Sequence, residues 1–301
     1  MTAATSKVPR SKTQVNSAPF ENPLIPNKRL CAVYTAMAEL RLLDAFVASR
    51  ANAKKPKVQL QASLGLEACR VSTALNLEPG DLTSESAPSI ATRFLRGAKL
   101  AELIAQVEAF HTGPRKAAAA FSSASELPLL APGKERIYLA LGAAQTLKAA
   151  PSGKTAKLSR ILVAYVNPTE LNTSEWTEAL HFASIHALPI LFVAFPDASV
   201  SAAKIGRLSR NATAAGVPGI LVDSADPVAL YRVMQESLER MRHNGGPVLM
   251  ECIEFRPTPR QPVADPIATM AAFLLGRKVV TEDWMRSVEQ KFRKRLETAS
   301  Q

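Results

Sequence analysis

The chain has 301 residues, of which 47% are hydrophobic, 6% aromatic and 21% charged, and its formal net charge is +11. These values exclude a fibrous or wholly disordered chain and allow a sizeable buried core. No apolar run approaches the ~20 residues of a spanning helix, so we expect no membrane segment.

Three cysteines lie far apart in the sequence, at Cys31, Cys69 and Cys252. They form no metal-ligand spacing, and an odd number is a poor basis for a disulfide framework. We therefore expect a reducing, cytoplasmic compartment.

The basic residues are spread along the whole chain, while the aromatic residues lie mostly within apolar runs. This distribution favours a basic solvated surface over a nucleic-acid-binding patch. Residues 1–27 are expected to form a disordered basic tail, because the first 20 contain Lys7, Arg10 and Lys12 but no acid. The alternative is a mitochondrial transit peptide, which would place the protein in the matrix.

The first half of the chain has the periodicity of helices. Residues 28–50 carry apolar side chains every three or four positions, which predicts an amphipathic helix. A second helical stripe begins near Ala68 and ends at the turn sequence of residues 78–81. Further helices are expected over residues 100–110 and 137–150, with a long loop over 112–134 between them.

Short apolar runs alternate with helical segments in the second half. Continuous apolar strands in such an arrangement predict a parallel sheet with helices on both faces. We therefore expect an α/β doubly wound domain over residues 28–257, with helical N- and C-terminal extensions. The C-terminal extension, residues 258–301, is expected to be a loop and helices packed on that domain. The expected strands are 161–166, 188–195, 219–222 and 248–253, and the expected helices are 174–187, 202–215 and 227–243.

Five segments of the chain carry a family resemblance through their order and spacing. They are LCAVYTAMAELRLLDAF (30–46), GLEACRVSTALNLEPGD (65–81), EALHFASIHALPILFVAF (178–195), GVPGILVDSADPVALYRVMQESLERMRHNGGPVLMECIEFR (216–256) and EDWMRSVEQKF (282–292). Together they resemble the alpha subunits of thiamine-diphosphate-dependent 2-oxo acid dehydrogenases of the pyruvate and branched-chain types. The resemblance implies the thiamine-diphosphate-binding fold, thiamine diphosphate and Mg²⁺ as cofactors, and a beta-type subunit or a second copy as partner.

The resemblance also implies where a cofactor site would lie. The family places Gly-Asp-Gly after a strand, an asparagine a few residues on, and another asparagine after the next strand. Here the strand 161–166 is followed by Asn167-Pro168-Thr169, Asn172 matches the first asparagine, and Pro196-Asp197 stands in the second asparagine region. The candidate cofactor-binding residues are therefore Asn167, Asn172 and Asp197, and Asn167 and Asp197 are the candidate metal ligands.

The candidate site departs from the family pattern. A diphosphate needs backbone N–H donors with no side chain in the way, yet neither glycine is present and Pro168 has no N–H. The loops that carry histidines in the family have none here after His111 within residues 112–125, nor within residues 257–266. We therefore predict a catalytically degenerate chain, with no catalytic residue assigned, that serves as a structural or regulatory partner.

Three alternatives remain open. In the first, the chain is an active decarboxylating subunit in which Asn167 and Asp197 exchange roles at an altered Mg²⁺-diphosphate site. In the second, both residues are ordinary turn formers. In the third, the chain is a basic nucleic-acid-binding protein, for which affinity would fall steeply with salt.

Overall fold

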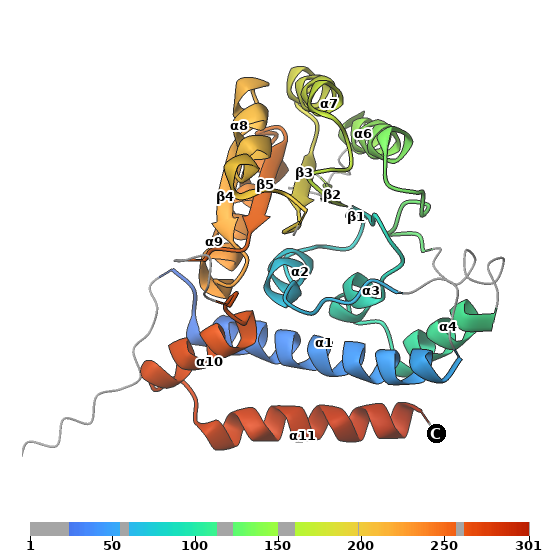
Figure 1. Cartoon of the computed structure of the whole chain (residues 1–301), viewed down its shortest axis with the longest axis vertical. Helices are drawn as coiled ribbons and strands as arrows, with labels where there is room; N and C mark the ends of the chain where they lie inside the picture. Colours follow the sequence, from blue (N-terminus) through green and yellow to red (C-terminus); the bar gives the residue numbers. More distant parts are fainter. Residues whose placement is uncertain are drawn as a thin grey trace, which may run out of the picture.

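One five-stranded parallel sheet organises the computed structural model, which describes residues 24–54, 60–112, 123–149, 160–197, 199–256 and 262–300. The strand order is β1-β2-β3-β5-β4. Helical segments lie at both ends of the described chain (Figure 1), so the predicted α/β doubly wound architecture is confirmed. Residues 1–23 of the expected tail lie outside the described part. The strands are β1 (Leu82–Ser84), β2 (Leu162–Val166), β3 (Ile190–Ala194), β4 (Gly219–Asp223) and β5 (Val248–Ile253).

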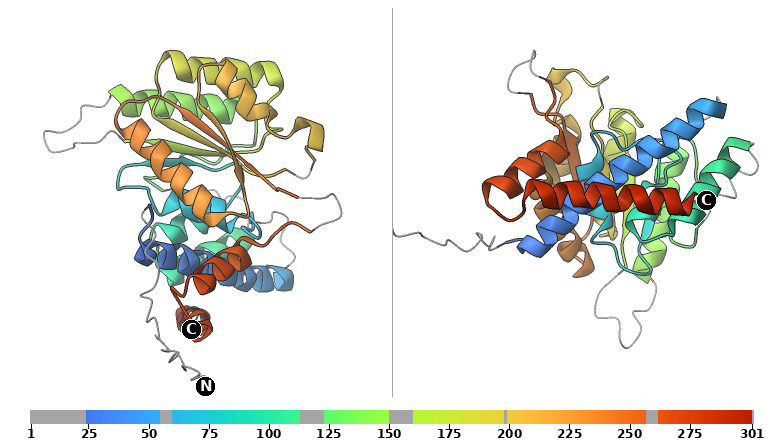
Figure 2. Two further views of the ribbon diagram at one scale, coloured as in Figure 1. Left: turned by 90° about the vertical axis from the view of Figure 1, so that its left-hand side faces the viewer. Right: turned by 90° about the horizontal axis from the view of Figure 1, so that it is seen from below.

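Successive side chains of a strand point to opposite faces of the sheet. Both faces are buried, each in its own hydrophobic core. Tyr165 and Val193 belong to the core on one face, whereas Val166 and Phe192 belong to the core on the other. Figure 2 shows the resulting layers of helix, sheet and helix. The first face is covered by α2 (Glu67–Ala74) and α9 (Pro227–Arg242), with α1 (Asn27–Lys54) packed on the outside of α2, and the second by α6 (Lys134–Ala149), α7 (Thr173–Ile185) and α8 (Arg207–Ala214).

Of the two C-terminal helices, α10 (Pro266–Gly276) lies beside α1 and contacts α2 and α9, and α11 (Glu282–Ala299) adds a further layer outside α1 (Figure 1). In α11 the apolar residues Trp284, Val288, Phe292 and Leu296 recur every four positions, and this stripe faces inward. The Trp284 ring lies 5.7 Å from that of Tyr34, and the Phe292 ring lies 5.5 Å from that of Phe94. The long first helix therefore lies between α2 on one side and α11 on the other.

The structure corrects the expected elements in three places. It contains β1 and the short helix α3 (Ala91–Leu95), which are too short to leave a periodic signal. The helix expected over 202–215 is interrupted: a 3₁₀ turn (Ala202–Lys204) precedes α8, and Gly206 between them has a φ of 73°. Residues 125–127 of the expected 112–134 loop run beside β1, where Thr83 is hydrogen-bonded to Ser125 and Leu127. That loop begins after α4 (Leu100–Thr112), and its residues 113–122 lie outside the described ranges.

Asp44 of α1 provides a pH-dependent test of the packing between α1 and α2. Its carboxylate accepts the backbone N–H of Ser63 at 2.6 Å. Burial raises the pKa of Asp44 from 3.8 to about 6, against the opposing effects of the Ser63 hydrogen bond and the Arg70 charge. The folded protein then holds this proton more tightly than the unfolded chain does, so stability falls as pH rises between these two values and is constant above them.

The variant Asp44→Asn is expected to lack this fall, because the amide resembles the protonated acid and still offers an acceptor to Ser63. At pH 7 its free energy of unfolding should exceed that of the unsubstituted chain by about 2–3 kcal/mol. Urea denaturation at pH values from 4 to 7.5 checks this. Parallel stability curves for the two proteins would show that Asp44 keeps an ordinary pKa.

Candidate functional site

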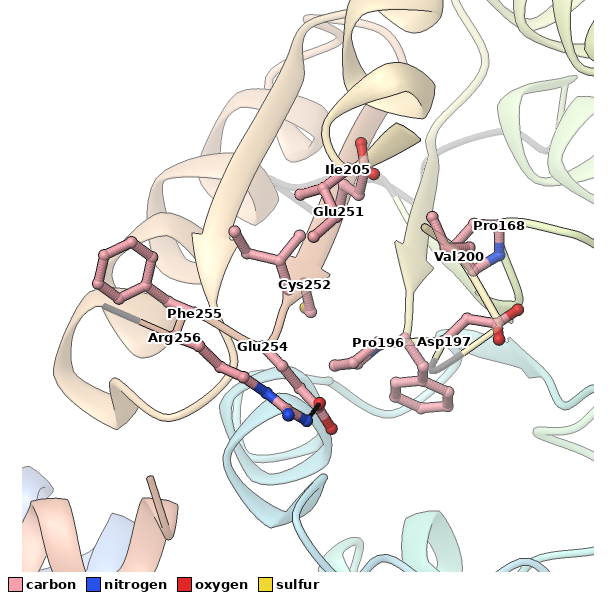
Figure 3. Close-up of a pocket in the computed structure, with 12 residues that line it drawn as sticks. Pro168, Pro196, Asp197, Val200, Ile205, Glu251, Cys252, Glu254, Phe255 and Arg256 are labelled. Atoms are coloured by element: carbon pink, nitrogen blue, oxygen red, sulfur yellow. Dashed lines mark hydrogen bonds and ion pairs between the residues drawn. The ribbon is translucent and has the colours of Figure 1, made fainter. Parts of the chain in front are cut away.

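A cavity of about 590 Å³ lies at the carboxyl ends of β2, β3 and β5 (Figure 3). Open parallel sheets bind ligands outside the carboxyl ends of their strands, and the volume is typical of small-molecule sites. The location therefore makes this cavity the candidate site. Its apolar wall includes Phe195, Val200, Ile205 and Cys252, and its polar groups include Asp197, Glu251, Glu254 and Arg256.

The turn between β2 and α7 is closed around the side chain of Glu170. Glu170 donates its backbone N–H to the carbonyl of Asn167 at 3.0 Å, and its carboxylate accepts the N–H of Asn167 at 3.4 Å. The same carboxylate accepts the N–H of Gly133 at 3.1 Å. A protein carboxylate thus receives the backbone donors beside this strand end, where an anionic ligand would otherwise be expected.

Arg136 of α6 fixes that carboxylate. Its Nε and Nη2 atoms donate to the two oxygens of Glu170 at 2.7 and 2.6 Å, and both side chains are fully buried. Its Nη1 atom donates to the hydroxyl of Ser84 at 2.9 Å, at the end of β1. The guanidinium group therefore joins the ends of two neighbouring strands.

Asn172 is the N-cap of α7. Its Oδ1 atom accepts the backbone N–H of Glu175 at 3.0 Å and the hydroxyl of Ser174 at 2.7 Å. The Glu175 carboxylate accepts the Asn172 N–H in return at 3.0 Å, which completes a capping box. Asn172 is not among the described residues that line the cavity.

Asp197 follows β3 and borders the cavity (Figure 3). Its Oδ1 atom accepts the hydroxyl and the N–H of Ser199 at 2.6 and 2.8 Å, and its Oδ2 atom accepts the hydroxyl of Thr169 at 2.7 Å. These hydrogen bonds, that of Ser199 first, lower the pKa of Asp197, so the group is a carboxylate at neutral pH. The ends of β2 and β3 do meet, but the hydrogen bond between them joins Thr169 rather than Asn167 to Asp197.

A second buried arginine, Arg70 of α2, lies at the same edge of the sheet. Its guanidinium lies over the rings of Tyr165 and Phe195, 5.0 and 4.9 Å from their centres. It donates to Glu85, directly after β1, at 3.0 Å and to Gln61 at 2.9 Å. Arg70, Arg136 and Glu170 are not among the site residues predicted from the sequence. The available signal is a charged residue inside an apolar helical stripe, as Arg70 is between Ala68 and Val71.

Carboxylates therefore follow four strands of the sheet within a few residues of the strand end. Three of them are paired with arginines, because Glu85 contacts Arg70, Glu170 contacts Arg136 and Glu254 contacts Arg256. Asp197 is instead held by hydroxyl and backbone donors. This edge of the sheet is thus rich in negative charge, and its buried arginines are already engaged.

Across the residues that the structure describes, no three or more His, Cys, Asp and Glu side chains are grouped so that they could hold a metal ion. No helix that the structure describes has the length and apolar character to cross a membrane.

Comparison with known proteins places this geometry in a family context. The alpha subunit of 2-oxoisovalerate dehydrogenase from Pseudomonas aeruginosa is 23% identical over 292 residues, covering 87% of this chain and 69% of the relative. The chloroplastic pyruvate dehydrogenase E1 component subunit alpha-3 from Arabidopsis thaliana is 27% identical over 187 residues, covering 55% of this chain and 44% of the relative. The alpha subunit of acetoin:2,6-dichlorophenolindophenol oxidoreductase from Bacillus subtilis is 28% identical over 201 residues, covering 64% and 59%.

Two of these three alignments span less than two thirds of the relative's own length. The family model described as dehydrogenase E1 component matches residues 34–262, which is most of the chain and includes the whole sheet. The chain therefore belongs to the dehydrogenase E1 component family.

Proposed function

We propose that this chain is an alpha-type E1 subunit that serves as a structural or regulatory partner and does not itself hold thiamine diphosphate. The observation that carries the proposal is the turn between β2 and α7, where the buried Glu170 carboxylate accepts the N–H of Asn167 and, from the segment before α6, the N–H of Gly133. The family implies thiamine diphosphate and Mg²⁺, but the residues at this turn do not fit a diphosphate. A Cβ atom is present at both positions that flank Pro168, and Pro168 itself offers no N–H.

Electrostatics supports the same proposal. A diphosphate is strongly anionic, whereas the carboxylate of Asp197 lines the cavity without an arginine partner, and the one cavity arginine, Arg256, is already paired with Glu254. Each unit of negative charge placed about 4 Å from the Asp197 carboxylate would be repelled by about 4 kcal/mol at the effective dielectric constant of a protein surface. Arg70 and Arg136 do not offset this repulsion, since each already pairs with a buried or nearly buried carboxylate.

The proposed partner is a beta-type E1 subunit or a second copy of this chain. Its support is that the relatives named above are alpha subunits, and a subunit of that name functions within an assembly. A chain that keeps the sheet and its covering helices can retain the surfaces that such an assembly uses, even without a cofactor. We place the division between the main domain and its C-terminal helices near residue 258.

A second candidate function is an active decarboxylating subunit with an altered metal site. The observation in its favour is that Asp197 remains ionised at the cavity wall. A carboxylate oxygen is a suitable Mg²⁺ ligand, and Asn167 lies only two residues before the threonine that contacts Asp197. In this reading, the two candidate ligands would replace the aspartate and asparagine of the family pattern.

Calorimetric titration of thiamine diphosphate with Mg²⁺ into the full chain, alone and with a beta-type subunit, separates the two functions. We expect no Mg²⁺-dependent heat in either arrangement. Micromolar binding that disappears in Asp197→Asn and persists in Asp223→Asn would overturn the proposal in favour of the active subunit. Asp223 is the matched control because it also ends a strand of the sheet but is not among the described residues of the cavity wall.

A further inference from the structure

The strand β4 lies at the edge of the sheet and is paired on one side only. Within the described ranges its partner is β5, because β4 is the last strand in the order β1-β2-β3-β5-β4. Leu221, at the centre of β4, is 46% exposed, whereas every residue of β2 and β3 is buried. The left view of Figure 2 looks onto this side of the sheet. The fold thus leaves room for an additional strand beside β4.

The unpaired side of β4 presents backbone donors and acceptors. Ser224, directly after the strand, donates its N–H to the carbonyl of Ile253 in β5 at 2.8 Å. Alternate residues of a strand direct their N–H and C=O groups to the same side, so every second residue before Ser224 faces β5. The backbone groups of Gly219 and Leu221 therefore point to the unpaired side. The strand contains no lysine or proline that would discourage a further strand from pairing there.

Two arginines of α8 lie beside this edge. The Nη1 atom of Arg210 and the Cδ2 atom of Leu221 approach the same point, 3.2 and 3.6 Å from where a Cβ atom of Gly206 would lie. Arg207 lies three positions before Arg210, on the same side of the helix. Both arginines are exposed, and neither makes an ion pair with a carboxylate in the part of the chain that the structure describes. The edge is thus flanked by two uncompensated positive charges.

We propose that the β4 edge binds an extended acidic segment of a partner protein as an additional strand of the sheet. The backbone of that segment pairs with Gly219 and Leu221, and carboxylates at every second position lie against Arg207 and Arg210. Neither arginine is among the described residues of the cavity wall, and nor is Leu221. The inference therefore does not depend on the role proposed for the cavity.

The edge favours this occupant over two others. A nucleic acid would offer the arginines its phosphates, but a phosphate oxygen only accepts hydrogen bonds and cannot pair with the carbonyls of β4. A second copy in antiparallel pairing would place Arg207 and Arg210 of both chains on the same face of the joined sheet. Like charges placed across neighbouring strands are destabilising, so the charges fit an acidic segment better.

The first test is fluorescence anisotropy of a labelled peptide, Glu-Val-Glu-Val-Glu-Val, titrated with the full chain. Its glutamates lie on one face when the peptide is extended. We expect it to bind more tightly than Lys-Val-Lys-Val-Lys-Val. Arg210→Glu should weaken its binding by about fivefold or more, because an attraction is lost and a repulsion is added. Arg293→Glu is the matched control with the same change in charge, because Arg293 is exposed on α11, which packs on α1 and α4.

Methylation of the peptide backbone separates strand pairing from the attraction of charges alone. One version of the peptide carries N-methyl groups on its glutamates and another carries them on its valines. Only one of these two sets of N–H groups can face β4, so we expect one version to bind like the parent peptide and the other to lose its affinity. The N–H groups of Gly219 and Leu221 should also exchange more slowly with deuterium when the parent peptide is bound. Equal affinities of the two methylated versions would overturn the proposal.

Two further outcomes would also overturn it. If an oligonucleotide of six thymidines binds as tightly as the acidic peptide and loses as much affinity in Arg210→Glu, the arginines belong to a nucleic-acid site. If sedimentation velocity shows a dimer of the chain alone that Leu221→Lys dissociates, the edge belongs to a second copy.

Discussion

Replacing Arg136 with methionine is expected to lower the free energy of unfolding by about 3–5 kcal/mol. Methionine fills a similar volume but removes the guanidinium that neutralises Glu170. The Glu170 carboxylate would then be buried with only the N–H groups of Gly133 and Asn167 as partners. Breaking one side of a buried ion pair costs far more than the pair itself contributes, because the remaining charge cannot reach water.

Urea denaturation of Arg136→Met and of the double variant Arg136→Met/Glu170→Gln measures this effect. The double variant should recover most of the loss, since an amide is neutral and can still accept the Gly133 N–H. Arg232→Ala is the matched control, because Arg232 pairs with Glu236 on the surface of α9 with side chains 51% and 66% exposed. That exposed pair is expected to contribute less than about 1 kcal/mol. A loss of that small size in Arg136→Met would contradict the described burial of the ion pair.

The same ion pair shows why the site was harder to predict than the fold. β2, β3, β4 and β5 are apolar runs between helical segments, so their existence and parallel arrangement follow from local sequence. β1 has three residues and depends on pairing with β2 and with the segment 125–127, which no local pattern reveals. Arg136 and Glu170 are 34 positions apart in the sequence, and nothing in either segment indicates that they meet.

Asn172 is a different case, because its role as a helix N-cap can be predicted from the sequence. An asparagine followed three residues later by glutamate, at the start of an apolar helical pattern, is a helix N-terminal signature. The family resemblance instead pointed to Asn172 as a candidate cofactor-binding residue. The structure shows its side-chain oxygen engaged by Glu175 and Ser174, and cofactor binding by this residue remains a prediction.

Gly219→Ala is expected to lower the free energy of unfolding by about 3 kcal/mol or to prevent folding. Gly219 begins β4, and a Cβ atom there would lie 2.0 Å from the carbonyl oxygen of Ser209 in α8. The helix cannot easily withdraw, because the buried carboxylate of Glu251 in β5 accepts the backbone N–H groups of Ser209 at 2.7 Å and Gly206 at 3.0 Å. The close approach of α8 to β4 is therefore fixed from the neighbouring strand.

Gly142→Ala is the matched control for this substitution. Gly142 lies within α6, and a Cβ atom there would meet nothing within 4 Å. Alanine should raise the stability of that helix by up to about 1 kcal/mol, because glycine loses more backbone entropy on folding. Chemical denaturation of both variants measures how the same added methyl group changes the free energy of unfolding at the crowded Gly219 position and at the open Gly142 position. If Gly219→Ala changes the free energy of unfolding by less than about 0.5 kcal/mol, α8 can move away from β4. The part of the cavity wall that contains Ile205 would then move with α8.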